Sequence, residues 1–286
     1  MDVPRTLTTS DGATVAYRLR RPGAPRRLVV LLHGLASNST RWSELVALTK
    51  LTESWDLLRP DLRGNGGSVW RGRLGMREWC ADLAEILDAE GYARAVLVGH
   101  CLGANVAVEF ASRHAERVTG LVLVEPMPRE ALTGTLGTVT RVAPLLPPAV
   151  LFVRALNALG LHRRQLEPLD LAVLDSETRA RMARGADAAD LERRYASWRL
   201  DLRSTATGAY LQMLRAVTRP LPDPTTLRLP VLALLSSGST FTDPAITELW
   251  LARIPHCRLL RLDARHWIPT EQPAEMRRAI EEFCHA

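Results

Sequence analysis

The chain of 286 residues predicts a doubly wound α/β fold, in which helices cover both faces of a mostly parallel sheet. Short apolar runs alternate with segments of helical spacing over residues 28–125, the pattern of strands joined by crossover helices. Each run is continuously apolar, as in Leu28–Leu32, which is typical of a strand buried on both faces. The alternation breaks over residues 127–225 and resumes with apolar runs at 230–235 and 258–262, which indicates a helical insertion.

Local signals define the elements in order. Asp11-Gly12 is a two-residue turn signal and predicts an N-terminal hairpin. Ser39 suits a helix N-cap, Gly91 a helix end, and Asp243-Pro244 a helix start. Pro144–Pro148 predicts a loop within the insertion. The expected strands are 6–9, 14–18, 28–32, 55–58, 95–98, 121–124, 230–235 and 258–262, and the expected helices outside the insertion are 39–49, 76–90, 104–114, 244–252 and 276–283.

Composition and charge argue against several classes of function. The hydrophobic fraction of 47% is that of a globular protein, and no apolar run approaches the roughly 20 residues of a transmembrane helix. The net charge of +6 comes almost entirely from scattered arginines without interleaved aromatic residues, so we expect no nucleic-acid partner. The N-terminus has no basic region followed by an apolar stretch, so we expect no signal peptide. Cysteines without paired spacing favour free thiols in a cytoplasmic protein, and we expect no metal or other cofactor; they are Cys80, Cys101, Cys257 and Cys284.

One turn carries the strongest functional signal, Gly99-His100-Cys101-Leu102-Gly103. It ends an apolar run and opens a helix of small residues, and side chains at its two glycines would clash with the adjacent strand or helix. The form Gly-x-Cys-x-Gly resembles the nucleophile elbow of the α/β-hydrolase family, with cysteine where serine is usual. The resemblance implies that Cys101 is the nucleophile and that Gly99, His100 and Gly103 support it.

A second loop resembles the same family at His33-Gly34-Leu35, directly after an apolar run. The resemblance implies an oxyanion hole formed by the backbone N–H groups of Leu35 and Leu102, which would stabilise a developing oxyanion by about 3 kcal/mol. Gly34 supports this loop. We expect the His33 imidazole to hold the loop backbone and to take no part in the chemistry.

The family order of catalytic residues is nucleophile, acid, histidine. His266, after the last apolar run, begins a segment that resembles the family's closing motif, so we assign it as the general base. The acid is open between Asp243 and Glu125. We prefer Asp243, although it lies two residues beyond the family spacing and equally suits a helix cap. Glu125 follows the sixth strand, from which some family members draw their acid.

A cysteine nucleophile favours activated acyl substrates. Its thiol ionises near pH ~8.5 and needs less help from a base than a serine hydroxyl. A thiolate exchanges readily with a thioester or an activated ester, and the acyl-cysteine can pass its acyl group to water, an amine or a hydroxyl. One alternative is a lyase-like enzyme in which His266 abstracts a proton without an acyl-enzyme. Another is a non-catalytic protein that uses the fold to bind a ligand.

The insertion, residues 127–225, matches the helical cap of the family, so the core comprises residues 1–126 and 226–286. A cap would supply most of the substrate pocket. The expected partner is a small-molecule acyl substrate, free or linked to a carrier or CoA, and no membrane span is expected. The oligomeric state is not indicated. Arginines of the insertion that could face an anionic substrate are Arg163, Arg164, Arg193, Arg194 and Arg199.

Overall fold

The structure is a computed structural model that describes residues 2–185, 187–238 and 240–286. Its eight strands form a sheet in the order β1-β2-β4-β3-β5-β6-β7-β8. The N-terminal hairpin joins antiparallel to β4, and all other neighbours are parallel, as the alternating pattern predicts. The strands are β1 (Asp2–Thr8), β2 (Thr14–Arg20), β3 (Arg27–Leu32), β4 (Trp55–Pro60), β5 (Ala95–His100), β6 (Val118–Val124), β7 (Val231–Ser236) and β8 (Cys257–Leu262).

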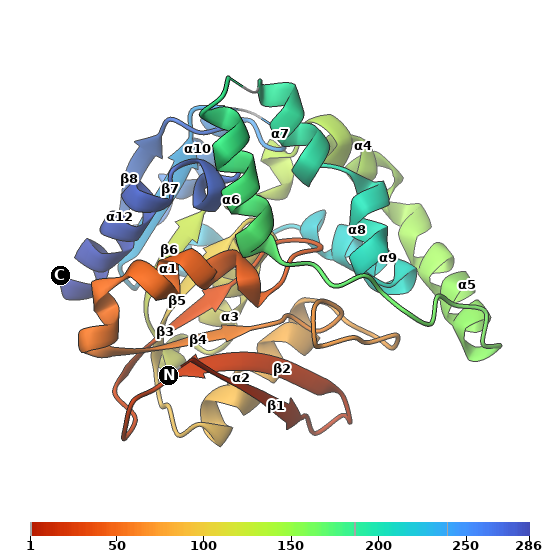
Figure 1. Cartoon of the computed structure of the whole chain (residues 1–286), viewed down its shortest axis with the longest axis horizontal. Helices are drawn as coiled ribbons and strands as arrows, with labels where there is room; N and C mark the ends of the chain where they lie inside the picture. Colours follow the sequence, from red (N-terminus) through yellow and green to blue (C-terminus); the bar gives the residue numbers. More distant parts are fainter. Residues whose placement is uncertain (1, 186, 239) are drawn as a thin grey trace.

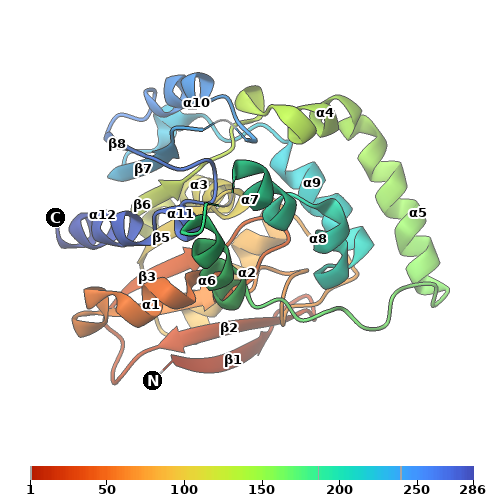
Figure 2. The same ribbon diagram turned by 45° about the horizontal axis from the view of Figure 1, so that its top comes forward.

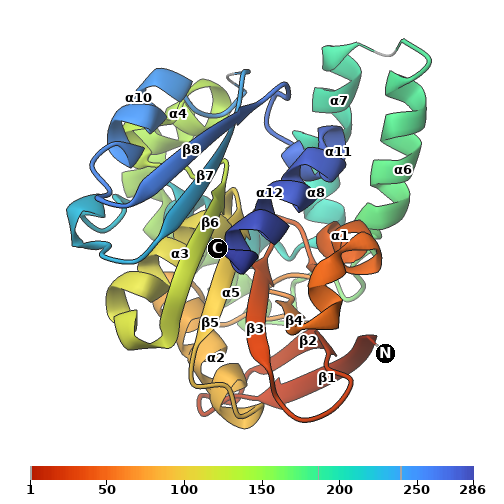
Figure 3. The same ribbon diagram turned by 90° about the vertical axis from the view of Figure 1, so that its left-hand side faces the viewer.

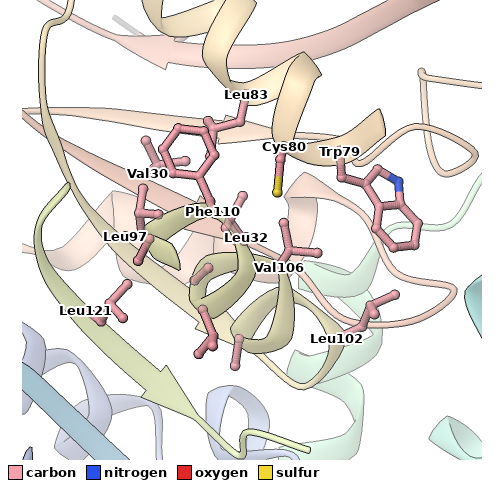
Figure 4. Close-up of a cluster of buried hydrophobic side chains, with 14 of the residues drawn as sticks. Val30, Leu32, Trp79, Cys80, Leu83, Leu97, Leu102, Val106, Phe110 and Leu121 are labelled. Carbon is pink, nitrogen blue, oxygen red and sulfur yellow. The ribbon is translucent and has the colours of Figure 1, made fainter. Parts of the chain in front are cut away.

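Helices cover both faces of this sheet (Figures 1 and 3). Side chains alternate along β3, so Val30 and Leu32 pack toward α2, α3 and α10 while Val29 and Leu31 pack toward α1 and α12. Figure 4 shows the first of these clusters, in which Phe110 of α3 lies against the sheet. These helices are α1 (Ser43–Leu48), α2 (Met76–Ala89), α3 (Leu102–Arg113), α10 (Pro244–Leu251) and α12 (Pro273–His285), with the short α11 (Ile268–Glu271) before the last.

Short 3-10 helices join several of these elements. The first of them, η1, directly precedes α1 and carries Arg41, a residue of the cavity described below. The 3-10 helices are η1 (Ser39–Trp42), η2 (Lys50–Glu53), η3 (Ala115–Arg117), η4 (Arg129–Ala131), η5 (Ala143–Leu145) and η6 (Pro224–Thr226).

Between β6 and β7 the chain leaves the sheet and forms six further helices, which lie beyond the carboxyl ends of the strands (Figures 1 and 2). We call residues 127–225 the β6–β7 insertion. Its helices are α4 (Gly134–Val142), α5 (Leu146–Ala158), α6 (Leu171–Met182), α7 (Ala188–Tyr195), α8 (Trp198–Ser204) and α9 (Thr207–Val217).

The expected loop at Pro144–Pro148 is wrong, because the helix continues through it. Pro147 and Pro148 occupy the first turn of α5, where a missing N–H costs nothing. The resulting helical run Gly134–Ala158 has 25 residues and a mean hydropathy of 1.5 in its most apolar window, of which 17% is buried. By length and composition alone this run could cross a membrane, contrary to the sequence-based expectation that no apolar run is long enough.

Candidate active site

The turn between β5 and α3 holds Cys101 in a strained conformation at the carboxyl edge of the sheet. Its backbone has φ 56° and ψ −122°, in the region that favours glycine. The strain is held by hydrogen bonds on both sides: the Cys101 N–H donates to the Val124 carbonyl (2.9 Å), and its own carbonyl accepts from the Ala104 N–H (2.9 Å). The thiol therefore stands at the start of a helix, where the helix dipole favours negative charge.

Both glycines of this turn are required by close backbone packing. A Cβ on Gly99 would collide with the Gly103 carbonyl, and a Cβ on Gly103 would collide with the carbonyl groups of Leu32 and His33. The obstacle at each position is main chain, which cannot move aside as a flexible side chain can. The sequence motif is therefore a packing requirement of the strand–turn–helix unit.

The loop after β3 lies against the same turn. A Cβ on Gly34 would lie 3.1 Å from the Cys101 Cβ. The His33 imidazole is buried; its Nδ1–H donates to the Gly34 carbonyl (2.8 Å), and its Nε2 accepts from the Leu62 N–H (2.9 Å). Both ring nitrogens are thus used to fix backbone, and burial lowers the pKa of His33 to about 4, so the ring is neutral.

The two residues expected to supply oxyanion donors are close in the chain to Gly34 and Cys101. Leu35 follows Gly34 and lines the same cavity as Cys101. Leu102 is the first residue of α3, so its N–H belongs to the first turn, whose donors have no partner within the helix. The role of both N–H groups as an oxyanion hole stays a prediction.

His266 lies between β8 and α11 and is held on several sides. Its Nδ1 is 3.1 Å from Oε2 of Glu125. The Glu271 carboxylate accepts hydrogen bonds from the N–H groups of Arg265 (3.1 Å), His266 (3.4 Å) and Trp267 (3.0 Å), and so shapes the loop that carries the histidine. The edge of Phe241 packs on the imidazole, with ring centroids 4.8 Å apart. The ring is 98% buried and has little freedom to turn.

Glu125, the alternative acid of the sequence analysis, is the carboxylate that contacts His266. It follows β6 directly and has a positive φ of 53°. Its N–H donates to the Leu234 carbonyl (2.9 Å), and its Oε1 accepts from the Ser236 N–H (2.5 Å), both on β7. Two strand ends therefore fix this carboxylate, with one oxygen on backbone and the other on the histidine.

The preferred acid, Asp243, is placed elsewhere, and that preference needs correction. Its Oδ1 accepts hydrogen bonds from the N–H groups of Ala245 (2.9 Å) and Ile246 (3.2 Å), so it caps α10. Among the described residues it does not line the cavity that contains Cys101 and His266. The helix start uses the carboxylate, which is the role that the following proline indicates.

The pKa values of His266 and His100 are shifted in opposite directions. Burial lowers the pKa of His266, but interactions with Cys101 and Glu125 outweigh this and raise it to about 9. His100 has the opposite shift: burial, then the nearby charges of His266 and Arg41, lower its pKa. The His100 Nε2–H donates to the His266 carbonyl (3.0 Å). The neutral imidazole of His100 therefore fixes the backbone of the loop that carries the protonated His266.

Met127, which contacts Cys101, is a residue that the sequence analysis missed. Sδ of Met127 lies 3.0 Å from Sγ of Cys101. The Asn105 side chain fixes Met127 by accepting from its N–H (2.9 Å) and donating to its carbonyl (3.0 Å). Asn105 lies two residues after Gly103, and a single polar residue in this otherwise apolar part of the helix is the sequence signal that could have identified it.

A cavity of about 720 Å³ opens above Cys101 and His266. This is within the usual range for small-molecule sites. Its walls come from the loop after β3 and from helices of the insertion, and they are mainly apolar, with Leu136, Leu211 and Leu214 among them. Of the five insertion arginines singled out from the sequence, Arg193 and Arg194 are among the lining residues.

Comparison with known proteins identifies the family of the chain. The family model described as the alpha/beta hydrolase fold matches residues 27–273. The chain belongs to the α/β-hydrolase family. The match includes the nucleophile turn, the loop after β3 and His266.

Individual α/β-hydrolase relatives are distant. A Caulobacter vibrioides protein named as a carbamate hydrolase, RutD, is 34% identical over 122 residues, which are 42% of this chain and 44% of that protein. The chain therefore aligns with less than half the length of that relative. The lipase LipV of Mycobacterium tuberculosis is 29% identical over 264 residues, 91% of this chain and 93% of LipV. The solved structure of a hydrolase from Pseudomonas aeruginosa PA01 superposes with a TM-score of 0.72, 25% identity and coverage of 99% and 98% of the two chains.

Proposed function

We propose that the chain is an enzyme that cleaves or transfers the acyl group of a small-molecule ester or thioester through an acyl-cysteine on Cys101. The observation that carries the proposal is that Cys101 and His266 both line the mainly apolar cavity, while Glu125 contacts the Nδ1 side of His266. A cysteine at a helix start beside a histidine has the two neighbours that activated cysteine nucleophiles use.

The first half-reaction forms the acyl-enzyme. The Cys101 sulfur attacks the acyl carbonyl carbon, and the carbonyl electrons move to an oxyanion, which the N–H groups of Leu35 and Leu102 stabilise. The bond to the leaving group then breaks, and the His266 imidazolium gives its proton to the departing thiolate or alkoxide. Glu125 touches the far ring nitrogen, so it positions His266 and stabilises its charge.

The second half-reaction releases the acyl group. Neutral His266 takes a proton from water, an alcohol or an amine, which attacks the acyl-cysteine. The thiolate leaves and the imidazolium is restored. Because sulfur is a good leaving group, substrates with a thiolate or an activated alkoxide as leaving group suit the first step better than ordinary esters.

The β6–β7 insertion acts in this proposal as a cap on a core of residues 1–126 and 226–286. Support comes from the cavity, whose walls are shared between core loops and insertion helices. The substrate would be free or linked to a carrier or CoA. The free cysteines favour a cytoplasmic protein.

Intact-protein mass spectrometry after mixing with a butyryl thioester tests the proposal. We expect an acyl adduct on the wild type that Cys101→Ala removes and that Cys80→Ala keeps. Cys80 is a matched control because burial raises the pKa of its thiol to about 12. His266→Gln should slow both half-reactions, because His266 protonates the leaving group in the first and takes the proton of the acceptor in the second. Absence of an adduct in both the wild type and His266→Gln contradicts the scheme.

Two further outcomes point to the alternatives. Turnover that survives in Cys101→Ala without an adduct would favour elimination with His266 as base. Iodoacetamide labelling tests the non-catalytic alternative, since burial raises the pKa of the thiols of Cys80, Cys257 and Cys284 to about 12, 11 and 12. Labelling at Cys101 no faster than a model thiol at pH 7 would favour a ligand-binding protein.

A further inference from the structure

Arg41 is a buried cation in the wall of the cavity that the sequence analysis did not single out. It lies in η1, shortly after the loop that carries Leu35. Its side chain is only 4% exposed, yet it is among the residues that line the cavity. A buried guanidinium keeps its charge and needs hydrogen-bond acceptors around it.

The described residues satisfy only one edge of this guanidinium. Nη1 donates to both oxygens of Asp175 (2.7 and 2.8 Å) and to Oγ1 of Thr270 (2.8 Å). Nε is buried and has no acceptor in the described part of the chain. The Asp175 carboxylate, by contrast, is well supplied with donors, because the Tyr195 hydroxyl (2.7 Å) and the Thr270 hydroxyl (3.0 Å) also bond to it.

The charged pair is arranged so that the cation, and not the anion, faces the cavity. Arg41 and Tyr195 line the cavity, whereas Asp175 and Thr270 do not belong to its described lining. The carboxylate therefore holds the guanidinium from behind. The positive charge also acts on the nucleophile turn: after burial and the charge of His266, it contributes to the lowered pKa of His100.

The other arginines of the cavity differ from Arg41. The side chains of Arg193 and Arg203 are 66% and 59% exposed, so water screens their charge. Arg194 is 21% exposed and pairs with Glu177 at 2.9 Å. A ligand group in the cavity would meet at Arg41 a cation that is shielded from water and paired with Asp175 on the side away from the cavity.

We propose that Arg41 binds a carboxylate of the substrate, so that the acyl chain transferred through Cys101 bears a second, free carboxylate. The inference rests on the proposed acyl-cysteine function. Nη2 of Arg41 makes no hydrogen bond among the described residues and, unlike Nε, is not fully buried, so it can donate to a carboxylate oxygen in the cavity. Asp175 fixes the orientation of the guanidinium before the substrate arrives. The apolar part of the walls, which includes Leu136, Leu211 and Leu214, would hold the methylene groups between the two carboxyl carbons.

The competing interpretation is that Arg41 only ties the insertion to the core through Asp175. That role predicts loss of stability on substitution but no dependence on the charge of the acyl chain. Selectivity between matched acyl chains therefore separates the two, and it can be measured on the unmodified protein.

The test compares two thioesters with the same leaving group, succinyl and its methyl ester, by the rate of adduct formation on Cys101. We expect the wild type to react roughly 100-fold faster with the free carboxylate, the size expected for hydrogen bonds to a charged group. Arg41→Lys should reduce this preference about tenfold because a point charge replaces the fork. Arg199→Gln, which removes an exposed positive charge outside the described lining, should keep it.

Equal rates for the two thioesters on the wild type would overturn the inference, as would a preference that persists in folded Arg41→Gln. If neither thioester forms an adduct, the acyl-cysteine function itself fails. Thermal denaturation of Cys101→Ala with and without succinate then tests binding alone. Stabilisation by succinate that Arg41→Lys weakens would support carboxylate binding, and no stabilisation would contradict it.

Discussion

The sheet core and the β6–β7 insertion are both rich in apolar residues, but they use them differently. Every residue of β5 and β7 is buried. In the insertion, Leu151 and Phe152 are each 65% exposed and Leu159 is 75% exposed (α5 and its end in Figure 2). The core positions the reacting groups by backbone packing, whereas the insertion contributes a wall and a set of side-chain ion pairs.

Two glycines, one in the core and one in the insertion, illustrate this difference in packing. Gly103 in the core would direct a Cβ into the main chain of β3 and the loop after it. Gly160 in the insertion has φ +77°, but a Cβ there would meet nothing within 4 Å. The first glycine is required by tertiary packing and the second only by its own backbone conformation. The position of Cys101 should therefore shift when a small side chain is added to the neighbouring core glycine, and it should not shift when one is added at Gly160.

The largest effect expected from this comparison is on stability. Gly103→Ala should lower the free energy of unfolding by roughly 3 kcal/mol or more, since a buried methyl group against backbone forces the strand and helix apart. Gly160→Ala should cost only about 1 kcal/mol, the penalty of a Cβ in the left-handed region. Urea denaturation of both variants measures this. Equal losses would mean that the core is no more tightly determined than the insertion.

The next effect concerns the two candidate acids. Glu125→Gln should lower kcat/KM by about 100-fold, because the amide cannot stabilise the imidazolium as the carboxylate does. Asp243→Asn should leave kcat/KM within about twofold, since asparagine is also a good N-cap. Turnover of a butyryl thioester by both variants checks the assignment. A larger loss of kcat/KM in Asp243→Asn than in Glu125→Gln would indicate that Asp243 is the catalytic acid.

The smallest effect is in the pH dependence of stability. The pKa of His266 is raised to about 9 against about 6.5 in an unfolded chain, so its contribution is complete below pH 6.5 and is lost as the pH rises to about 9. The loss should be on the order of 2 kcal/mol. Urea denaturation of the wild type at pH 6.5 and 9.5 measures this loss. In His266→Gln the unfolding free energy should differ little between these two pH values.

Asp201 of the insertion should affect stability over a different, lower pH range. Burial raises its pKa to about 7, so its contribution is complete below pH 3.8 and is lost as the pH rises to about 7. Asp201→Asn should therefore change the pH dependence of the unfolding free energy only below pH 7, and the decrease between pH 7 and 9 should remain. A change above pH 7 in Asp201→Asn would show that the two regions do not titrate independently.

The sequence alone determined the architecture and singled out Cys101 and His266 as the candidate reacting residues. Continuous apolar runs alternating with helical spacing indicate a parallel sheet because a strand buried on both faces tolerates few polar side chains. Gly99 and Gly103 mark the turn at Cys101 because contacts within one strand–turn–helix unit demand them. Such signals are local, so they can be read along the chain.

The tertiary structure alone decided which carboxylate serves His266 and which arginine is buried. Glu125 and His266 are 141 positions apart, and their contact depends on how the ends of β6, β7 and β8 come together. Arg41 and Asp175 are 134 positions apart and meet only when the insertion lies on the core. No spacing in the sequence carries such information, because burial and hydrogen bonding between distant elements are set by the packing of the whole chain.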